Sequence, residues 1–136
     1  MLMKTRIGLK GLMVLIDLMG IIGCSKTVSS EQQAMDTVQE CYDALAKGDF
    51  ETFLKGRARM DSIPASFHEQ LLVAYKQFVK QQEKAHQGID HFTVTRAEMD
   101  SVNHQIQVFL MVCYADSVQE EIVVPMIEHQ GKWMMK

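Results

Sequence analysis

Ile106-Gln107-Val108-Phe109-Leu110-Met111-Val112-Cys113-Tyr114 is the stretch of sequence that decides the fold. Its second half is apolar at almost every position, which predicts a central strand covered on both faces. The flanking segment 92–97 alternates as a half-buried strand does, and 121–127 is predicted to form another strand. The chain turns at 100–103 and 115–117, and neither connection can hold a helical crossover, so we expect an antiparallel meander.

The chain ends with a further strand that begins at Trp133 and follows a tight turn over 129–132. Pro125, in the strand before it, lacks the N–H needed for a ladder hydrogen bond, which argues for an edge or a bulge at that position. The second half of the chain therefore predicts a sheet of about four strands.

A helical period replaces the strand pattern in the first half of the chain. A helix is predicted over 31–47 because its apolar residues fall on one face: Ala34, Val38, Cys41, Tyr42 and Leu45. Gly48 can end this helix, Asp49 can cap a short second one, and Gly56 can end that.

A third helix is expected to start at Ser66, which forms a capping box with Glu69, and to run toward Gln87. Helices followed by strands indicate an α+β fold. We therefore expect three N-terminal helices packed on one face of a curved antiparallel sheet.

The first residues carry Lys4, Arg6 and Lys10, and an apolar run over 11–22 follows them. A basic segment before a short apolar one is typical of a secretory signal. As a helix, residues 11–22 would span only about 18 Å of the ~30 Å hydrocarbon core, so a permanent membrane-spanning helix is disfavoured.

Ile21-Ile22-Gly23-Cys24 closes this run and resembles the lipobox of bacterial lipoproteins. The resemblance implies cleavage after Gly23 and diacylglycerol on the Cys24 sulfur. Residues 1–23 would then be a signal peptide, and 24–30 a lipidated cysteine with a polar tether. It also implies the bacterial cell envelope, where Ser25 favours the outer membrane, facing the periplasm. The alternative is a buried N-terminal helix that ends in a free cysteine.

The charge of the chain excludes one class of partner. The formal charge is −3, and it becomes −5 when Lys4, Arg6, Lys10 and Asp17 leave with the signal peptide. An acidic domain is not expected to bind nucleic acid. The expected partners are the membrane, through the lipid on Cys24, and either a small apolar ligand or an envelope protein; the oligomeric state stays open.

The run 42–50 places a helix end and Gly-Asp before the next helix, and Gly131-Lys132-Trp133 lies close to the end of the chain. Together they resemble nuclear transport factor 2-like (NTF2-like) domains, in particular small lipoproteins of that fold. The resemblance covers residues 31–136 and implies a cone, in which a bent sheet wraps around helices and leaves a pocket at the open end. It implies no chemistry, because the fold hosts isomerases, dehydratases and plain binding proteins.

An isomerase or dehydratase of this fold would need a desolvated carboxylate or histidine inside the cone. The candidates for pocket residues are Asp43 on the first helix and Arg96 and Glu98 on the first strand. Arg96 and Glu98 share a predicted strand face with Phe92 and Val94, although an exposed cross-strand pair is the alternative.

The sequence contains no other catalytic, cofactor or metal motif. The histidines have no i, i+4 pair for zinc, and a site formed by His86, His91 and Asp90 is the weaker interpretation. We therefore expect a binding protein without catalytic residues, cofactor or metal. A small-molecule isomerase or dehydratase is the alternative.

Two cysteines remain once Cys24 is assigned to lipid. Cys41 and Cys113 lie on apolar segments that should pack together, and the envelope is oxidising. A disulfide from helix to sheet is one outcome, and two free buried thiols are the other.

Overall fold

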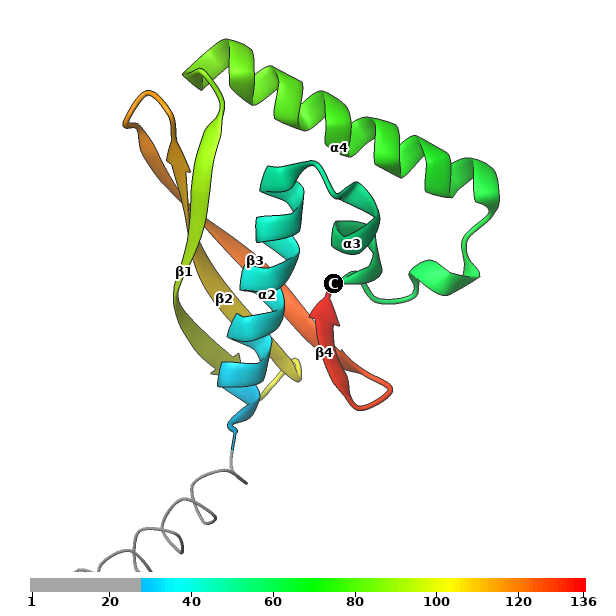
Figure 1. The fold of residues 1–136 in the computed structure, drawn as a ribbon. Helices are drawn as coiled ribbons and strands as arrows, with labels where there is room; N and C mark the ends of the chain where they lie inside the picture. The colour runs from blue at the N-terminus through cyan, green and yellow to red at the C-terminus, as the bar shows by residue number, and fades with distance from the viewer. Residues whose placement is uncertain (1–27) are drawn as a thin grey trace, which may run out of the picture.

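A computed structural model describes residues 28–136 (Figure 1). The predicted signal peptide, with Gly23 and Cys24, lies outside the described residues. The helical half contains α2 (Ser30–Lys47), α3 (Phe50–Lys55), the 3-10 helix η1 (Met60–Ser62) and α4 (Ala65–His86). The strands are β1 (Ile89–Asp100), β2 (Gln105–Tyr114), β3 (Gln119–His129) and β4 (Lys132–Met135). The predicted α+β order is confirmed.

The first two helices end where their capping residues predict. The Ser29 hydroxyl accepts a hydrogen bond from the Gln32 N–H at 3.1 Å and so caps the start of α2. Gly48 ends α2 with a φ of 83°, a left-handed conformation that glycine adopts without strain. The carboxylate of Asp49 accepts from the Thr52 N–H and caps α3.

The capping box predicted at Ser66 is wrong. Helix α4 begins two residues earlier than that prediction allows, with Pro64 as its N-cap and no side-chain cap. The backbone of Pro64 enters the helix at φ −62°, and its carbonyl accepts hydrogen bonds from Phe67 and His68. Because proline fixes φ near this value, the ring itself sets the helix start.

The sheet is a meander in the order β1-β2-β3-β4, and every neighbouring pair is antiparallel, as predicted. Pro125 lies where β3 becomes an edge, because β4 ends at Met135, which pairs with Met126. Beyond that point the Lys136 N–H donates to the Pro125 carbonyl at 3.0 Å. A register shift between Val94 and Arg96 marks a bulge in β1.

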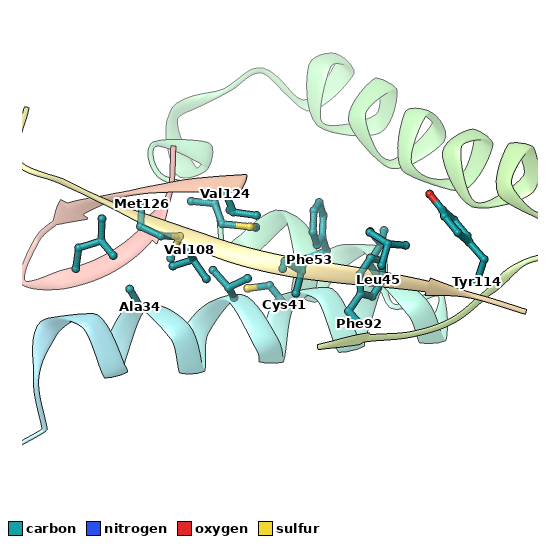
Figure 2. Packing of buried hydrophobic residues seen from close by; sticks show 14 residues of the cluster. Ala34, Cys41, Leu45, Phe53, Phe92, Val108, Tyr114, Val124 and Met126 are labelled. Carbon is teal, nitrogen blue, oxygen red and sulfur yellow. The ribbon is translucent and has the colours of Figure 1, made fainter. Parts of the chain in front are cut away.

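The core lies between α2 and one face of the sheet (Figures 1 and 2). From α2 it receives Ala34, Val38, Cys41 and Leu45, as the helical period predicts. Alternate residues of β2 meet them: Ile106, Val108, Leu110, Val112 and Tyr114. The described members of this cluster all fall between residues 34 and 135.

The other face of β2 corrects a prediction. The helices lie on one side of the sheet (Figure 1), and Phe109 and Met111 on the opposite face are only partly buried. The Arg96 guanidinium lies 3.6 Å from the centre of the Phe109 ring. The prediction that β2 is covered on both faces is therefore wrong. No second layer packs on this face within the described residues, and long side chains of the neighbouring strand shield Phe109 and Met111 instead.

Helix α4 is attached differently from α2, because none of its residues is fully buried. Near its C-terminus the His86 carbonyl accepts from the Asp116 N–H at 3.2 Å, and the Gly88 carbonyl accepts from Ala115 at 2.9 Å. Near its start, the His68 ring lies 3.3 Å from the Glu51 carboxylate of α3. The helix therefore bridges the open side of the fold (Figure 1). From residue 28 onward, no helix combines the length and apolar composition needed to cross a bilayer.

Candidate ligand-binding site

A cleft opens between α4 and the concave side of the sheet. Its wider chamber has a volume of about 510 Å³, within the range of small-molecule sites. Side chains from α2, α4 and three strands form its apolar walls, among them Leu45, Phe78, Phe92, Val112 and Ile122. The arrangement requires α4 to stand away from the sheet while remaining attached at both ends.

A narrower chamber of about 280 Å³ shares Tyr42, Phe53 and Tyr75 with the wider one. We call the two chambers together the aromatic cleft. Phe53 lies edge-to-face between the two tyrosines, with ring centres 5.1 Å from Tyr42 and 4.9 Å from Tyr75. Such contacts favour fixed ring positions, so the cleft has a defined aromatic wall.

Arg57 supplies the positive charge at the narrow end of the cleft. Its guanidinium donates a hydrogen bond to the Tyr75 hydroxyl at 3.0 Å. Burial raises the pKa of the Tyr42 phenol to about 12; the neighbouring Cys41 and Tyr75 add to the rise, and Arg57 opposes it. Tyr42 is therefore a neutral hydroxyl at ordinary pH.

His86 and Asp116 lie at the wide end. The His86 Nδ1 is 2.9 Å from the Asp116 carboxylate, and the imidazole stacks on the Tyr114 ring at 4.0 Å between centres. The hydrogen bond with His86 is the main cause that lowers the pKa of Asp116. Because the backbones of the two residues are also bonded, the pair ties the end of α4 to the β2–β3 turn.

The sequence did not reveal the His86–Asp116 pair, since the two residues are far apart in the chain and no motif joins them. The weaker alternative grouped His86 with His91 and Asp90, and the structure does not bring those three together. His91 pairs instead with Asp90, at 2.6 Å. Within residues 28–136, no three His, Cys, Asp or Glu side chains gather closely enough to hold a metal ion.

A second cavity, of about 460 Å³, lies beside the narrow end of the aromatic cleft, and Arg57 borders both. It is more polar, and we call it the basic cavity because its walls carry several cationic side chains. These are Lys55, Arg57, Arg59 and Lys132. Glu51 and Asp61 also line it, but Glu51 already pairs with His68.

The predicted pocket residues do not line the aromatic cleft. Asp43 accepts a hydrogen bond at 2.9 Å from the side-chain amide of Gln39, which also donates to the Phe92 carbonyl at 2.8 Å and accepts from the Val94 N–H at 2.9 Å. Asp43 therefore supports a contact between α2 and β1. It contributes to the frame of the domain and leaves the chambers to other residues.

Arg96 and Glu98 pair with each other on the exposed face of the sheet. Their predicted location on the face of Phe92 and Val94 is wrong. The bulge between Val94 and Arg96 adds one residue, so Arg96 lies opposite Phe109 while Ala97 takes the inward position opposite Val108. The structure agrees with the alternative interpretation, in which Arg96 and Glu98 form an exposed pair.

Both described cysteines are buried free thiols. Cys41 belongs to the core beneath α2, whereas alternation along β2 puts Cys113 on the face opposite Val112 and Tyr114. The structure therefore does not bring the two sulfur atoms together. Burial, with a smaller effect of Glu40, raises the pKa of Cys41 to about 11, so this thiol is a poor nucleophile.

Three helices followed by a curled four-stranded antiparallel sheet form an NTF2-like cone, and the fold prediction is confirmed. A solved protein from Campylobacter jejuni, described as an NTF2-like transpeptidase, has this fold with a TM-score of 0.56. The match covers 74% of this chain and 94% of that one at 12% identity, so it shows the fold alone. No protein-family model and no curated protein matches the chain.

Proposed function

We propose that this chain is a lipid-anchored, non-catalytic binding protein of the bacterial cell envelope, and that the aromatic cleft holds a small apolar ligand. The observation that carries the proposal is α4: 22 residues long, amphipathic, and without a single buried residue. Its side chains Ala74, Tyr75 and Phe78 line the wide chamber, and Tyr75 and Val79 also pack against the edge of the core. An NTF2-like fold is compatible with such a site.

The energetic argument rests on exposed apolar surface. Phe78 on α4 lines the wide chamber and is 40% exposed. Ile122 on β3 lines the same chamber and is only partly buried. Each 100 Å² of apolar surface that a ligand removes from water contributes roughly 2.5 kcal/mol. A ligand that covers this apolar surface would therefore be stabilised by the removal of that surface from water.

The character of the cleft supports binding over catalysis. Among residues 28–136, no carboxylate, histidine or other charged side chain is fully buried, so the walls offer no strongly desolvated carboxylate or imidazole. The Campylobacter protein is named a transpeptidase, and acyl transfer of that kind would need an activated nucleophile. Cys41 does not provide one, since it is buried and its pKa is raised.

The experiment uses the chain from residue 25 onward, which contains every described member of the core. Fluorescence of the neutral probe N-phenylnaphthylamine should rise saturably on binding. Ala74 lines the wide chamber on α4, so Ala74→Trp should fill it and weaken binding at least tenfold. Ala85→Trp is the matched control, because Ala85 is an exposed residue of the same helix and does not line the cleft. Absence of binding, or equal loss in both variants, contradicts the proposal.

The proposed anchor is supported by the basic first residues, the short apolar run over 11–22 and the lipobox-like Ile21-Ile22-Gly23-Cys24 that closes it. An alkyne analogue of palmitate fed to bacteria expressing the full chain should label the protein and appear in the membrane fraction. Cys24→Ser should remove the label and release the protein from membranes. Labelling that persists in this variant would contradict the assignment of the lipid to Cys24.

One observation favours an isomerase or dehydratase as a second candidate: His86, which is paired with Asp116, lines the wide end of an apolar cleft. With Nδ1 bonded to the carboxylate, Nε2 would be free to act as a base. Hydrogen–deuterium exchange at the α-carbon of cyclic ketones, followed by NMR, tests this. Exchange that is catalysed by the wild-type chain and lost in His86→Gln would favour the enzyme.

A further inference from the structure

We propose that the ligand of the aromatic cleft is an anionic amphiphile, an apolar chain that ends in a carboxylate, with its headgroup at Arg57. This inference rests on the proposed binding function and names the chemical class of the ligand.

The backbone around Arg57 is fixed from both sides. Arg57 forms a parallel bridge with Met135, in which the Met135 N–H donates to Gly56 and the Ala58 N–H donates to Met135, both at 2.8 Å. The Arg57 N–H donates to the Leu54 carbonyl at 3.1 Å. The side chain therefore starts from a rigid position and reaches the Tyr75 hydroxyl across the narrow chamber.

The charge of Arg57 has no acidic partner. Within residues 28–136, no carboxylate oxygen lies within 4.0 Å of its guanidinium. Guanidinium has five N–H donors, and the Tyr75 hydroxyl receives a single bond from them. A partly buried cation beside aromatic rings is costly without a counter-ion. A carboxylate in the narrow chamber would accept the unused donors, in the planar geometry that this pair favours.

Two phenols complete the headgroup site. The Tyr42 and Tyr75 side chains line both chambers, and each carries a hydroxyl that can donate a hydrogen bond. Tyr42 is held in place by edge-to-face contacts with Phe53 and with Phe92, at 5.1 and 5.0 Å between ring centres. One cation and two hydroxyls are therefore arranged around a space that is otherwise apolar.

The charges along the cleft give the ligand a direction. Glu120 lines the wide chamber, far from Arg57, and would repel an anion there. Beside the narrow chamber, the basic cavity adds Lys55, Arg59 and Lys132. The headgroup is thus favoured at the narrow end, with the apolar chain along Phe92, Val112 and Ile122.

The test compares dodecanoate with dodecanol, both below micellar concentration, by calorimetry on the chain from residue 25 onward. Arg57→Met keeps the length of the side chain and removes its charge, so dodecanoate affinity should fall at least tenfold while dodecanol affinity stays the same. Arg59→Met is the matched control, because Arg59 lines only the basic cavity. It should change the affinity for dodecanoate less than threefold.

The outcomes separate this inference from the function on which it rests. Equal affinity for the two probes in the wild-type chain, or an Arg57→Met variant that binds dodecanoate normally, overturns the headgroup assignment and leaves an apolar site. Failure of both probes to bind overturns the binding function as well. If Arg57→Met does not fold, NMR decides: the Arg57 Nε–H resonance of the wild-type chain should shift with dodecanoate and stay in place with dodecanol.

Discussion

Helices α2 and α4 are both long and amphipathic, yet they contribute to the fold in opposite ways. Helix α2 buries five residues against the sheet and α3, among them Val38 and Leu45. Helix α4 is four residues longer and buries none. It is attached near its ends through His68 and His86, and in its middle through Tyr75, which contacts Phe53 and Arg57.

The difference shows that an apolar stripe on a helix does not by itself identify core. The stripe of α2 is matched by a continuous set of inward residues on β2, so it packs at the density of a protein interior. The stripe of α4 faces the rim of a curved sheet, where the strands diverge from it. The space that remains is the aromatic cleft.

The largest expected effect compares a leucine from each helix. Leu45→Ala on α2 should lower the free energy of unfolding by about 2–5 kcal/mol, because it opens a cavity in a closed core. Leu71→Ala on α4 should cost about 1 kcal/mol or less, because Leu71 is only partly buried. Urea unfolding of both variants measures the difference, and equal losses would refute the contrast between the helices.

The next largest effect is expected at Gly56, whose backbone lies against the Cys41 side chain of α2. A Cβ added at Gly56 would overlap the Cys41 sulfur and would lie 3.2 Å from the Met135 side chain. Gly56→Ala should therefore destabilise the fold by about 1–3 kcal/mol. In a Cys41→Ala background the sulfur is absent, so the same substitution should cost clearly less. Urea unfolding of the four chains gives the coupling, and additive losses would count against the overlap.

Alkaline pH should lower the stability of the domain through two residues of α2, Cys41 and Tyr42. Burial raises the pKa of Cys41 from 9.0 to about 11 and that of Tyr42 from 10.0 to about 12. The unfolded state loses these protons first, so their contribution to stability is complete below pH 9 and is lost as the pH rises through 11 to 12. Urea midpoints between pH 8 and 11 should fall, and they should fall less in Cys41→Ala. Parallel curves would argue against the buried thiol as a cause.

Acidic pH should weaken the attachment of the C-terminal end of α4, which depends on the contact between His86 and Asp116. The pKa of Asp116 is lowered, chiefly by its hydrogen bond with His86. Its contribution is therefore present above its ordinary pKa of 3.8 and is lost as the pH falls through the lower value of the folded state. Amide exchange should show reduced protection of the Ala115 and Asp116 N–H groups on acidification, and Asp116→Asn should show that loss already at neutral pH. A variant with full protection would show that the carboxylate does not hold the helix end.

The smallest effect is expected on the exposed face of the sheet. Glu98→Gln removes an exposed ion pair with Arg96, so stability should change by less than about 0.5 kcal/mol. Binding in the aromatic cleft should be unaffected, because Glu98 lies on the opposite face. A loss of affinity for the neutral probe in this variant would show that Glu98 contributes to binding in the aromatic cleft.

The sequence predicted the elements well where local chemistry decides them. Gly48 and Asp49 fixed the break between α2 and α3, and short turns made the meander the only simple topology. It misplaced Arg96 and Glu98, because a bulge has no reliable signature in a single sequence and inverts the faces beyond it. It also missed Arg57, which looked like part of an irregular connection.

The sequence by itself determined the order of helices and strands, the inward residues of α2 and β2, and the lipobox-like segment. Each of these depends on residues near one another in the chain. Only the tertiary structure decided that α4 stands away from the sheet, that His86 meets Asp116, and that Arg57 faces Tyr75 without an acidic partner among residues 28–136. These contacts join residues distant in sequence, and the curvature of the sheet, which no local pattern specifies, sets the space between them.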